Sequence, residues 1–321
     1  MRAGETGGPT MTTYATPHAG THAAPPAGGH APEQSARKEP ARESPAGQQS
    51  AREPLPLLLA HGAGGGIEAN FAPVREALAA GGRRVVGFDL PGTGAAPRAT
   101  APLDLDALAD GLVAAADAAG AARFAVAGYS LGSAVAVRAA TRHPERVSAL
   151  VLTAPFALAD HALRQTALLW RDLADGDRPE LLARLLVPLA FGAATLEALT
   201  TEAVEAAVRL TAESIPPGSA DHADLVARAD VRADLPRLTV PTLVVSTTED
   251  RLVSPALHRG VAASIPGARL TELATGHAPF AENPEAWGKL MAEFLEHAGR
   301  QEDAPRPGVG WLRPERAVRG R

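Results

Sequence analysis

The sequence predicts an α/β protein in which helices cover both faces of a mostly parallel sheet. Six short apolar runs are typical of buried strands, and longer segments with a helical period separate most of them. One interval, residues 156–235, carries helical patterns and no convincing strand. Strands that alternate with helices form a parallel sheet between two helical layers. The helical interval is therefore expected to be an insertion over one end of that sheet.

The elements follow one another along the chain as this class requires. Segments such as "PVREALAAGG", "LDALADGLVAAADAAG" and "SAVAVRAATRHPE" have the spacing of amphipathic helices, as do "DHALRQTALLWRDLAD" and "RPELLARLLVPLAF" in the helical interval. We therefore expect a core of residues 54–155 and 236–298, and a helical cap of residues 156–235. The expected strands lie at residues 56–60, 84–88, 123–127, 147–153, 241–246 and 268–273.

The two ends of the chain have a different composition. Residues 1–53 are rich in alanine, proline, glycine, serine and charged residues. They show no sustained hydrophobic period of 2 or 3.6 residues, the periods of strands and helices. Residues 299–321 are basic and rich in proline and glycine. We expect a disordered N-terminal tail and a flexible C-terminal tail.

Composition narrows the classes of function. A chain of 321 residues can bury a substantial core, and its net charge of -5 gives no electrostatic reason to expect nucleic acid as a partner. No apolar segment approaches the roughly 18 to 20 residues that span a bilayer, and the N-terminus lacks the apolar region of a signal peptide. We therefore expect a cytoplasmic protein with no membrane partner. The absence of cysteine excludes disulfides, thiolate metal sites and cysteine nucleophiles.

The first expected strand runs into a glycine cluster, "LLLAHGAGGG". Such a turn can cradle a dinucleotide pyrophosphate, or it can direct a main-chain N–H at a reacting carbonyl oxygen. Gly62 and Gly64 fill two places of the dinucleotide fingerprint, but Ile67 stands in the third. Asp89, at the end of the next strand, lies near the position of a ribose-binding acid. The dinucleotide-binding alternative therefore stays open at this point.

A second glycine motif carries a candidate nucleophile. In "FAVAGYSLGSAVAVRAATRHP", Ser130 stands between Gly128 and Gly132 at a strand-to-helix turn. A sharp turn of this kind exposes its apex side chain, and flanking glycines relieve the clash with the neighbouring strand and helix. A serine needs a base and an orienting acid to react. His277 and Asp250 follow later expected strands in the order serine, acid, histidine, with Glu249 as an alternative acid.

Together these motifs resemble the α/β-hydrolase superfamily with a helical cap. The resemblance covers about residues 55–297 and rests on "HGAGGG", "DLPGTG", "GYSLG", "TTEDRLVSP" and "GHAPFAENPE". It implies a triad of Ser130, Asp250 and His277, with the main-chain N–H groups of Ala63 and Leu131 as an oxyanion hole. It implies no cofactor and no metal. Members usually begin with an antiparallel hairpin, whereas residues 30–54 contain no strand pattern, so we expect about six strands instead of eight.

Two residues beside these motifs have expected structural roles. His61 is expected to brace the glycine-rich loop through hydrogen bonds, and Asp89 to organise the turn into "LPGTG". In the cap, Phe156, Trp170 and Phe191 are expected in the apolar core, with a place in the substrate pocket as the alternative.

The expected reaction is hydrolysis of a small to medium carboxylic ester or lactone through an acyl-enzyme on Ser130. The partner is then a small-molecule acyl substrate. Because His277 must be neutral to act as base, activity should rise as this histidine loses its proton. An acyltransferase, a thioesterase, a carbon–carbon hydrolase or a non-catalytic ligand-binding member of the same scaffold remain alternatives. The natural substrate and the oligomeric state stay open.

Overall fold

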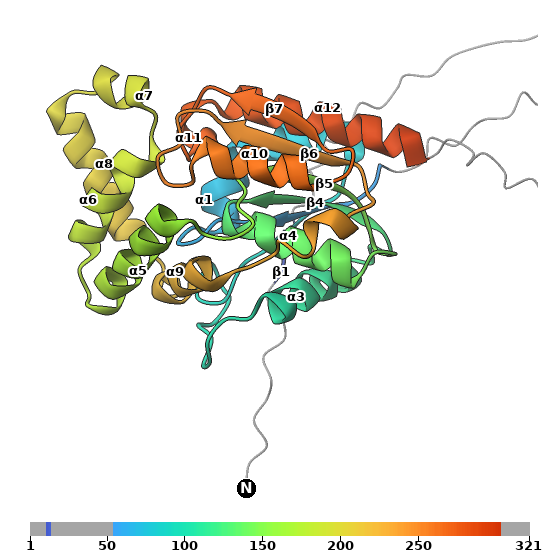
Figure 1. Cartoon of the computed structure of the whole chain (residues 1–321), viewed down its shortest axis with the longest axis horizontal. Helices are drawn as coiled ribbons and strands as arrows, with labels where there is room; N and C mark the ends of the chain where they lie inside the picture. Colours follow the sequence, from blue (N-terminus) through green and yellow to red (C-terminus); the bar gives the residue numbers. More distant parts are fainter. Residues whose placement is uncertain (1–10, 14–53, 303–321) are drawn as a thin grey trace, which may run out of the picture.

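The structure, a computed structural model, describes residues 11–13 and 54–302 of the chain. These residues form a seven-stranded sheet in the order β1-β3-β2-β4-β5-β6-β7, with helices packed on both faces (Figure 1). The strands are β1 (Met11–Thr13), β2 (Leu57–Ala60), β3 (Val85–Phe88), β4 (Phe124–Tyr129), β5 (Val147–Thr153), β6 (Thr242–Thr247) and β7 (Arg269–Leu273).

The strands from β2 to β7 are mutually parallel and correspond to the six expected apolar runs. Strand β1 differs, because Met11–Thr13 pairs antiparallel with β3 at the edge of the sheet. The expectation of about six strands is confirmed for the parallel strands, whereas the expectation of a disordered tail over residues 1–53 is wrong at residues 11–13, which form one further edge strand. A three-residue strand is too short to show an alternating pattern, and it is stabilised by main-chain pairing with the free edge of β3. The rest of the expected N-terminal tail lies outside the described residues.

Two helical layers enclose the sheet. One face packs against α3, α4 and α10, and the other against α1, α2 and α12. Alternate residues of β2 divide between the layers, since Leu58 belongs to the first apolar cluster and Leu57 and Leu59 to the second. A strand buried on both faces is apolar throughout, which is why it appears in the sequence as a continuous apolar run.

The bounds of these helices are as follows. On the first face lie α3 (Leu105–Ala118), α4 (Leu131–Arg142) and α10 (Pro255–Ser264); on the second lie α1 (Ile67–Phe71), α2 (Arg75–Leu78) and α12 (Pro284–Glu302), with the short α11 (Pro279–Glu282) before α12. Short 3-10 turns are Ala72–Val74, Ala80–Gly82 and Leu235–Arg237. Helix α12 extends past residue 298, so the expected start of the C-terminal tail at residue 299 is wrong. Residues 303–321 lie outside the described part.

Residues 156–235, which we call the cap segment, connect the neighbouring strands β5 and β6. An isolated bridge between Leu158 and Asp230 joins the two ends of this segment. Helix starts are marked by capping side chains, as where Asp160 accepts from the main-chain N–H of Leu163. In Figure 1 the helices α6, α7 and α8 stand beside the sheet. The helices are α5 (His161–Asp175), α6 (Pro179–Ala190), α7 (Ala193–Ala198), α8 (Thr201–Ser214) and α9 (Ser219–Arg228).

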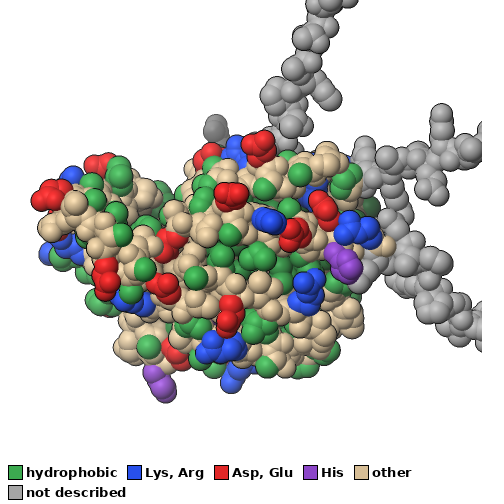
Figure 2. All heavy atoms as spheres, turned by 90° about the horizontal axis from the view of Figure 1, so that it is seen from above, with side chains coloured by type: hydrophobic (Ala, Val, Ile, Leu, Met, Phe, Trp, Pro, Cys, Tyr) green, Lys and Arg blue, Asp and Glu red, His purple; other side chains and the backbone are tan. Residues whose placement is uncertain are grey.

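The surface carries charges of both signs. Figure 2 shows acidic and basic side chains interspersed over the face seen from above. Within the described ranges, no helix combines the length and the apolar character needed to cross a bilayer.

Candidate active site

The predicted site residues meet at one edge of the sheet. Ser130 directly follows β4, and the loops after β6 and β7 carry Asp250 and His277. Ala63 lies in the loop after β2, the neighbour of β4. The carboxyl ends of parallel strands share an edge, and ligands of open α/β sheets bind there. Four segments that are far apart in the sequence therefore contribute to one place.

The turn at Ser130 is strained and tightly packed. Ser130 has φ 52° and ψ -119°, a conformation that residues other than glycine rarely adopt. A Cβ atom on Gly128 would lie 2.5 Å from the carbonyl oxygen of Gly132, and one on Gly132 would overlap the carbonyl oxygen of Ala60. The two glycines thus allow α4 to approach both its own preceding strand and β2. The turn holds the Ser130 side chain at the end of β4.

The three predicted triad side chains form a continuous hydrogen-bonded chain. The Ser130 Oγ lies 3.0 Å from the His277 Nε2, and the His277 Nδ1 lies 2.6 Å from the Asp250 Oδ2. Because a carboxylate only accepts, the proton is assigned to Nδ1, which leaves the Nε2 lone pair facing the serine hydroxyl. Each of the three residues is only 5 % exposed. Glu249, the alternative acid, lies instead beside Gly192 of the cap segment.

Four donors hold the Asp250 carboxylate. Its Oδ1 accepts from the main-chain N–H groups of Leu252 and Val253, at 2.9 and 2.8 Å. Its Oδ2 accepts from the Thr247 hydroxyl at 3.0 Å as well as from His277. Hydrogen bonds to an ionised acceptor are short and strong, so this carboxylate is fixed in both position and orientation.

A second histidine, His258, faces the same carboxylate. Its Nε2 is 3.7 Å from the Asp250 Oδ2 and has no hydrogen-bond partner among the residues that the structure describes, while its Nδ1 lies 3.2 Å from the Ser246 Oγ. Burial lowers the pKa of His258 to about 4, although the Asp250 carboxylate opposes this shift. His258 is therefore a neutral, buried side chain at neutral pH.

The glycine-rich loop is braced by His61, as expected. The His61 Nε2 accepts from the main-chain N–H of Leu90 at 2.9 Å, so its Nδ1–H donates to the Gly62 carbonyl at 2.7 Å. Burial lowers the pKa of His61 to about 4, which keeps this imidazole neutral. Asp89 also serves the loop, because its Oδ1 accepts from the main-chain N–H of Ile67 at the start of α1. The expectation that Asp89 organises the turn into "LPGTG" stays a prediction, because this hydrogen bond goes to the glycine-rich loop instead.

Two main-chain donors in this region remain available. The N–H of Gly62 donates to the Asn70 Oδ1 and that of Gly64 to the His222 Nδ1, both at 3.1 Å. In residues 54–302, no intramolecular hydrogen bond uses the N–H of Ala63 or that of Leu131. Leu131 opens α4, where the first N–H groups lack partners within the helix. These two groups are the ones that the resemblance assigns to an oxyanion hole.

The cap segment touches the glycine-rich loop directly. His222, in α9, accepts from Gly64 and donates its Nε2–H to the Pro91 carbonyl at 3.0 Å. Trp170, in α5, packs so closely on Gly64 that a Cβ there would overlap its ring. The Trp170 Nε1–H donates to the Ser219 Oγ at 2.8 Å. Trp170 thus lies in an apolar cluster of the cap segment, and it contacts the site loop as well.

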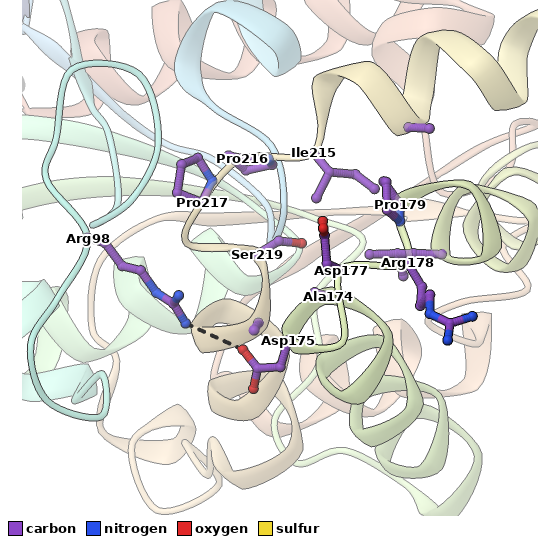
Figure 3. A pocket seen from close by; sticks show the side chains of 13 residues that line it. Arg98, Ala174, Asp175, Asp177, Arg178, Pro179, Ile215, Pro216, Pro217 and Ser219 are labelled. Carbon is purple, nitrogen blue, oxygen red and sulfur yellow. Dashed lines mark ion pairs between the residues drawn. The ribbon is translucent and has the colours of Figure 1, made fainter.

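A separate pocket of about 300 Å³ opens among α5, α6 and the connection between α8 and α9 (Figure 3). Arg98 reaches it from the core and pairs with Asp175 at 3.5 Å, the dashed line in Figure 3. The Arg98 guanidinium also makes two hydrogen bonds to Asp221. Ser130, Asp250 and His277 are not among its lining residues. Ser219 lines this pocket and also binds Trp170, so the pocket borders the region of the glycine-rich loop.

Several contacts of the site had no signal in the sequence. The Tyr129 hydroxyl donates to the His277 carbonyl at 2.8 Å, and Thr247 binds Asp250. Tyr129 occupies the variable position of the Gly-x-Ser-x-Gly motif, and its partner is distant in the sequence. Glu282 accepts from the main-chain N–H of Gly276. Glu282 lies inside the motif "GHAPFAENPE", but the motif alone does not indicate which residue Glu282 binds.

Comparison with known proteins agrees with this architecture. The model of the alpha/beta hydrolase fold family matches residues 56–284. The chain is 34% identical over 242 residues to a pyrrolizixenacetamide deacetylase of Xenorhabdus hominickii, which covers 74% of this chain and 90% of that protein. It is also 34% identical over 259 residues to a pimeloyl-[acyl-carrier protein] methyl ester esterase of Chromobacterium violaceum, with 75% and 94% covered.

A solved structure is similar over most of its length. The enol-lactonase of Burkholderia xenovorans superposes with a TM-score of 0.67 at 25% sequence identity, covering 78% of this chain and 94% of the other. The chain therefore belongs to the α/β-hydrolase fold family, and it is a hydrolase. The glycine-rich turn after β2 is therefore interpreted as part of a hydrolase and not as a dinucleotide-binding turn.

Proposed function

We propose that this protein is a serine hydrolase that cleaves a small to medium carboxylic ester or lactone. The observation that carries the proposal is the hydrogen-bonded chain from the Ser130 Oγ through His277 to Asp250. His277 Nε2 takes the hydroxyl proton as Ser130 Oγ bonds to the acyl carbon. Asp250 stabilises the imidazolium that forms, because it already binds the Nδ1–H.

The oxygen of the attacked carbonyl becomes negatively charged in this step. We assign its stabilisation to the N–H groups of Ala63 and Leu131, which have no partner within the described chain. One such donor contributes about 2.7 to 4 kcal/mol to the transition state. His277 then gives its proton to the leaving alkoxide, the bond to that oxygen breaks, and the acyl group remains on Ser130. Water activated by the same histidine releases the acid.

The walls around these groups favour an uncharged, apolar acyl substrate. Ala63 and Leu252 pack in one apolar cluster with Trp170, Leu185 and Leu186 of the cap segment. Substrate pockets are mostly apolar with a few placed polar groups, and this region has that composition. The relatives named as a methyl ester esterase and an enol-lactonase support an ester or a lactone as the substrate.

Intact mass after treatment with a fluorophosphonate tests the proposal. We expect one adduct on the wild type and on Ser264→Ala, whose serine is exposed on α10 and serves as the matched control. Ser130→Ala should take no adduct, and His277→Ala should react far more slowly. An unreactive, folded wild type would instead favour the non-catalytic ligand-binding alternative. Assays of p-nitrophenyl esters of increasing chain length, with and without an added alcohol, then separate hydrolysis from acyl transfer.

A further inference from the structure

The loop that carries His277 is bound to the cap segment on one side of the histidine and to Glu282 on the other. The main-chain N–H of Gly276 donates to the Glu282 Oε1 at 2.8 Å. The N–H of Ala278 donates to the carbonyl oxygen of Ala190, the last residue of α6, at 3.0 Å. The residue before the histidine and the residue after it are therefore both held by hydrogen bonds.

The same Glu282 carboxylate also binds the cap segment. Its Oε2 accepts from the main-chain N–H of Gly192 at 3.1 Å and from the Thr195 hydroxyl at 2.6 Å. Glu282 ends α11 and is half-buried. One carboxylate thus joins the histidine loop to residues 192–195, which include the start of α7.

Packing at this junction leaves no room for a side chain. A Cβ atom on Gly276 would lie 2.5 Å from the Ala190 carbonyl oxygen and would overlap the Gly192 nitrogen. On the other side of the same turn, a Cβ on Gly192 would lie 2.5 Å from the Glu249 Oε2. The histidine loop therefore rests directly on the main chain of residues 190–192, with the Glu249 and Glu282 carboxylates beside it.

The core supplies a third anchor of the histidine loop. The Tyr129 hydroxyl donates to the His277 carbonyl at 2.8 Å. Of the bonds from Gly276, Ala278 and Tyr129, the Ala278 bond ends on the cap segment. The Gly276 bond ends on Glu282, which the cap segment also binds. Movement of residues 190–195 would break the bond from Ala278 to Ala190. It would also remove two donors, the Gly192 N–H and the Thr195 hydroxyl, from the Glu282 carboxylate.

We propose that Glu282 is a positioning residue that places His277 for catalysis only while residues 190–195 are docked on the histidine loop. The proposal rests on the proposed function, in which His277 is the base. Under this proposal, residues 190–195 leave the histidine loop to admit a substrate to Ser130, which is only 5 % exposed in the docked arrangement. Return of residues 190–195 then restores the bonds to the loop and brings the Nε2 back to the serine hydroxyl. Docking of residues 190–195 and alignment of His277 with Ser130 then occur together. The chemical step therefore takes place only in a closed site from which water is excluded.

The matched test compares Glu282→Gln with Glu285→Gln. Glu285 is exposed in the first turn of α12, so its variant controls for loss of one charge nearby. Thr195→Val removes only the hydroxyl contact on the cap side. Hydrogen–deuterium exchange is followed in peptides covering residues 188–196 and 272–280. The rate of Ser130 phosphonylation, kcat and KM for an ester, and the thermal midpoint are measured on the same samples.

We expect Glu282→Gln to raise exchange in both peptides together and to lower kcat and the phosphonylation rate by up to about 100-fold, because a misplacement of about 1 Å has that effect. KM should change little, since the Glu282 carboxylate binds Gly276, Gly192 and Thr195, none of which belongs to the apolar cluster around Trp170. Thr195→Val should act in the same direction and more weakly. Glu285→Gln should match the wild type. If Glu282→Gln does not fold, the Thr195→Val comparison decides alone.

Two results would overturn the proposal even where the serine mechanism holds. Faster exchange in the 272–280 peptide alone would show that Glu282 does not join the two segments. A lower thermal midpoint with unchanged kcat would show a structural role only. A wild type that takes no phosphonate would overturn the serine mechanism and the catalytic part of this proposal with it, whereas the exchange data would still decide whether Glu282 links the two segments.

Discussion

The Asp250 carboxylate is oriented by both main-chain and side-chain hydrogen-bond donors. Asp250 receives two main-chain N–H groups on one oxygen and the Thr247 hydroxyl and His277 on the other. This division leaves only one arrangement of protons for the histidine, with Nδ1 protonated and Nε2 free to accept. The tautomer that the proposed reaction needs is therefore set by the carboxylate and its other partners.

Replacement of this carboxylate tests its role. In Asp250→Asn, the amide N–H₂ turned toward His277 would favour the tautomer with Nε2 protonated, which cannot accept from Ser130. We expect kcat to fall by about 10⁴-fold while the fold is kept, as for a comparable substitution in a serine protease. Steady-state kinetics with an ester and the far-ultraviolet circular dichroism spectrum check both points. Glu249→Gln is the control, and a larger loss in that variant would identify Glu249 as the acid.

At the scale of elements, α12 contributes to the site through a buried indole. Trp287 is 0 % exposed, stacks on Phe71 with ring centroids 5.5 Å apart, and lies edge-on to Tyr129. Its Nε1–H donates to the Thr153 Oγ1 at 2.9 Å. The helix thereby supports β5 and the tyrosine that holds the His277 carbonyl.

Removal of this indole should weaken the whole fold. Trp287→Ala leaves a cavity between α12 and the sheet, and we expect the free energy of unfolding to drop by about 3 to 5 kcal/mol. Leu210→Ala, at a side chain that is 66% exposed, should change it by less than about 0.5 kcal/mol. Urea denaturation followed by circular dichroism measures both. A loss for Trp287→Ala no larger than that for Leu210→Ala would contradict the packing described.

Across the whole molecule, three buried histidines link stability to pH. Burial lowers the pKa values of His61, His222 and His258 to about 4, and for His222 the neighbouring His61 adds to this shift. His61 and His222 hold the glycine-rich loop, and His258 lies beside Asp250. Protonation of these side chains therefore opposes the folded arrangement of the site itself.

Stability should fall as the solution is acidified from neutral pH. The unfolded chain takes up these protons near pH 6.5, whereas the folded chain does so only near pH 4, so between these values the unfolded state binds more protons. Each histidine then removes about 1.4 kcal/mol per pH unit in that window. Urea midpoints measured from pH 8 to pH 4.5 check this slope.

The exposed carboxylate of Asp110 should affect stability in a different pH range from the buried histidines. Asp110, whose pKa is lowered by hydrogen bonds to Arg142 and His143, should affect stability only at more acidic pH. A midpoint that stays constant from pH 6.5 to pH 5 would contradict the neutral, buried state of the three histidines.

Local patterns explain why much of the fold could be predicted. The six parallel strands depend on short continuous apolar runs and the helices between them on a period of 3.6 residues, and each segment carries its own pattern. The turn at Ser130 is likewise local, because its glycines, strand and helix are consecutive in the chain. Positions of Asp250 and His277 followed from their places after later strands. Strand β1 and the extension of α12 past residue 298 were missed, since three paired residues and a helix end have weak local signals.

The sequence by itself determined the parallel architecture, the hydrolase family motifs and the order of the candidate triad. Only the tertiary structure decided which atoms meet. The bonds of Tyr129 to His277, of Gly64 to His222 and of Glu282 to Gly192 connect segments that are distant along the chain. Hydrogen bonding to a distant partner leaves no periodic trace in either segment, because the contact exists only after the strands have set the loops side by side at one edge of the sheet.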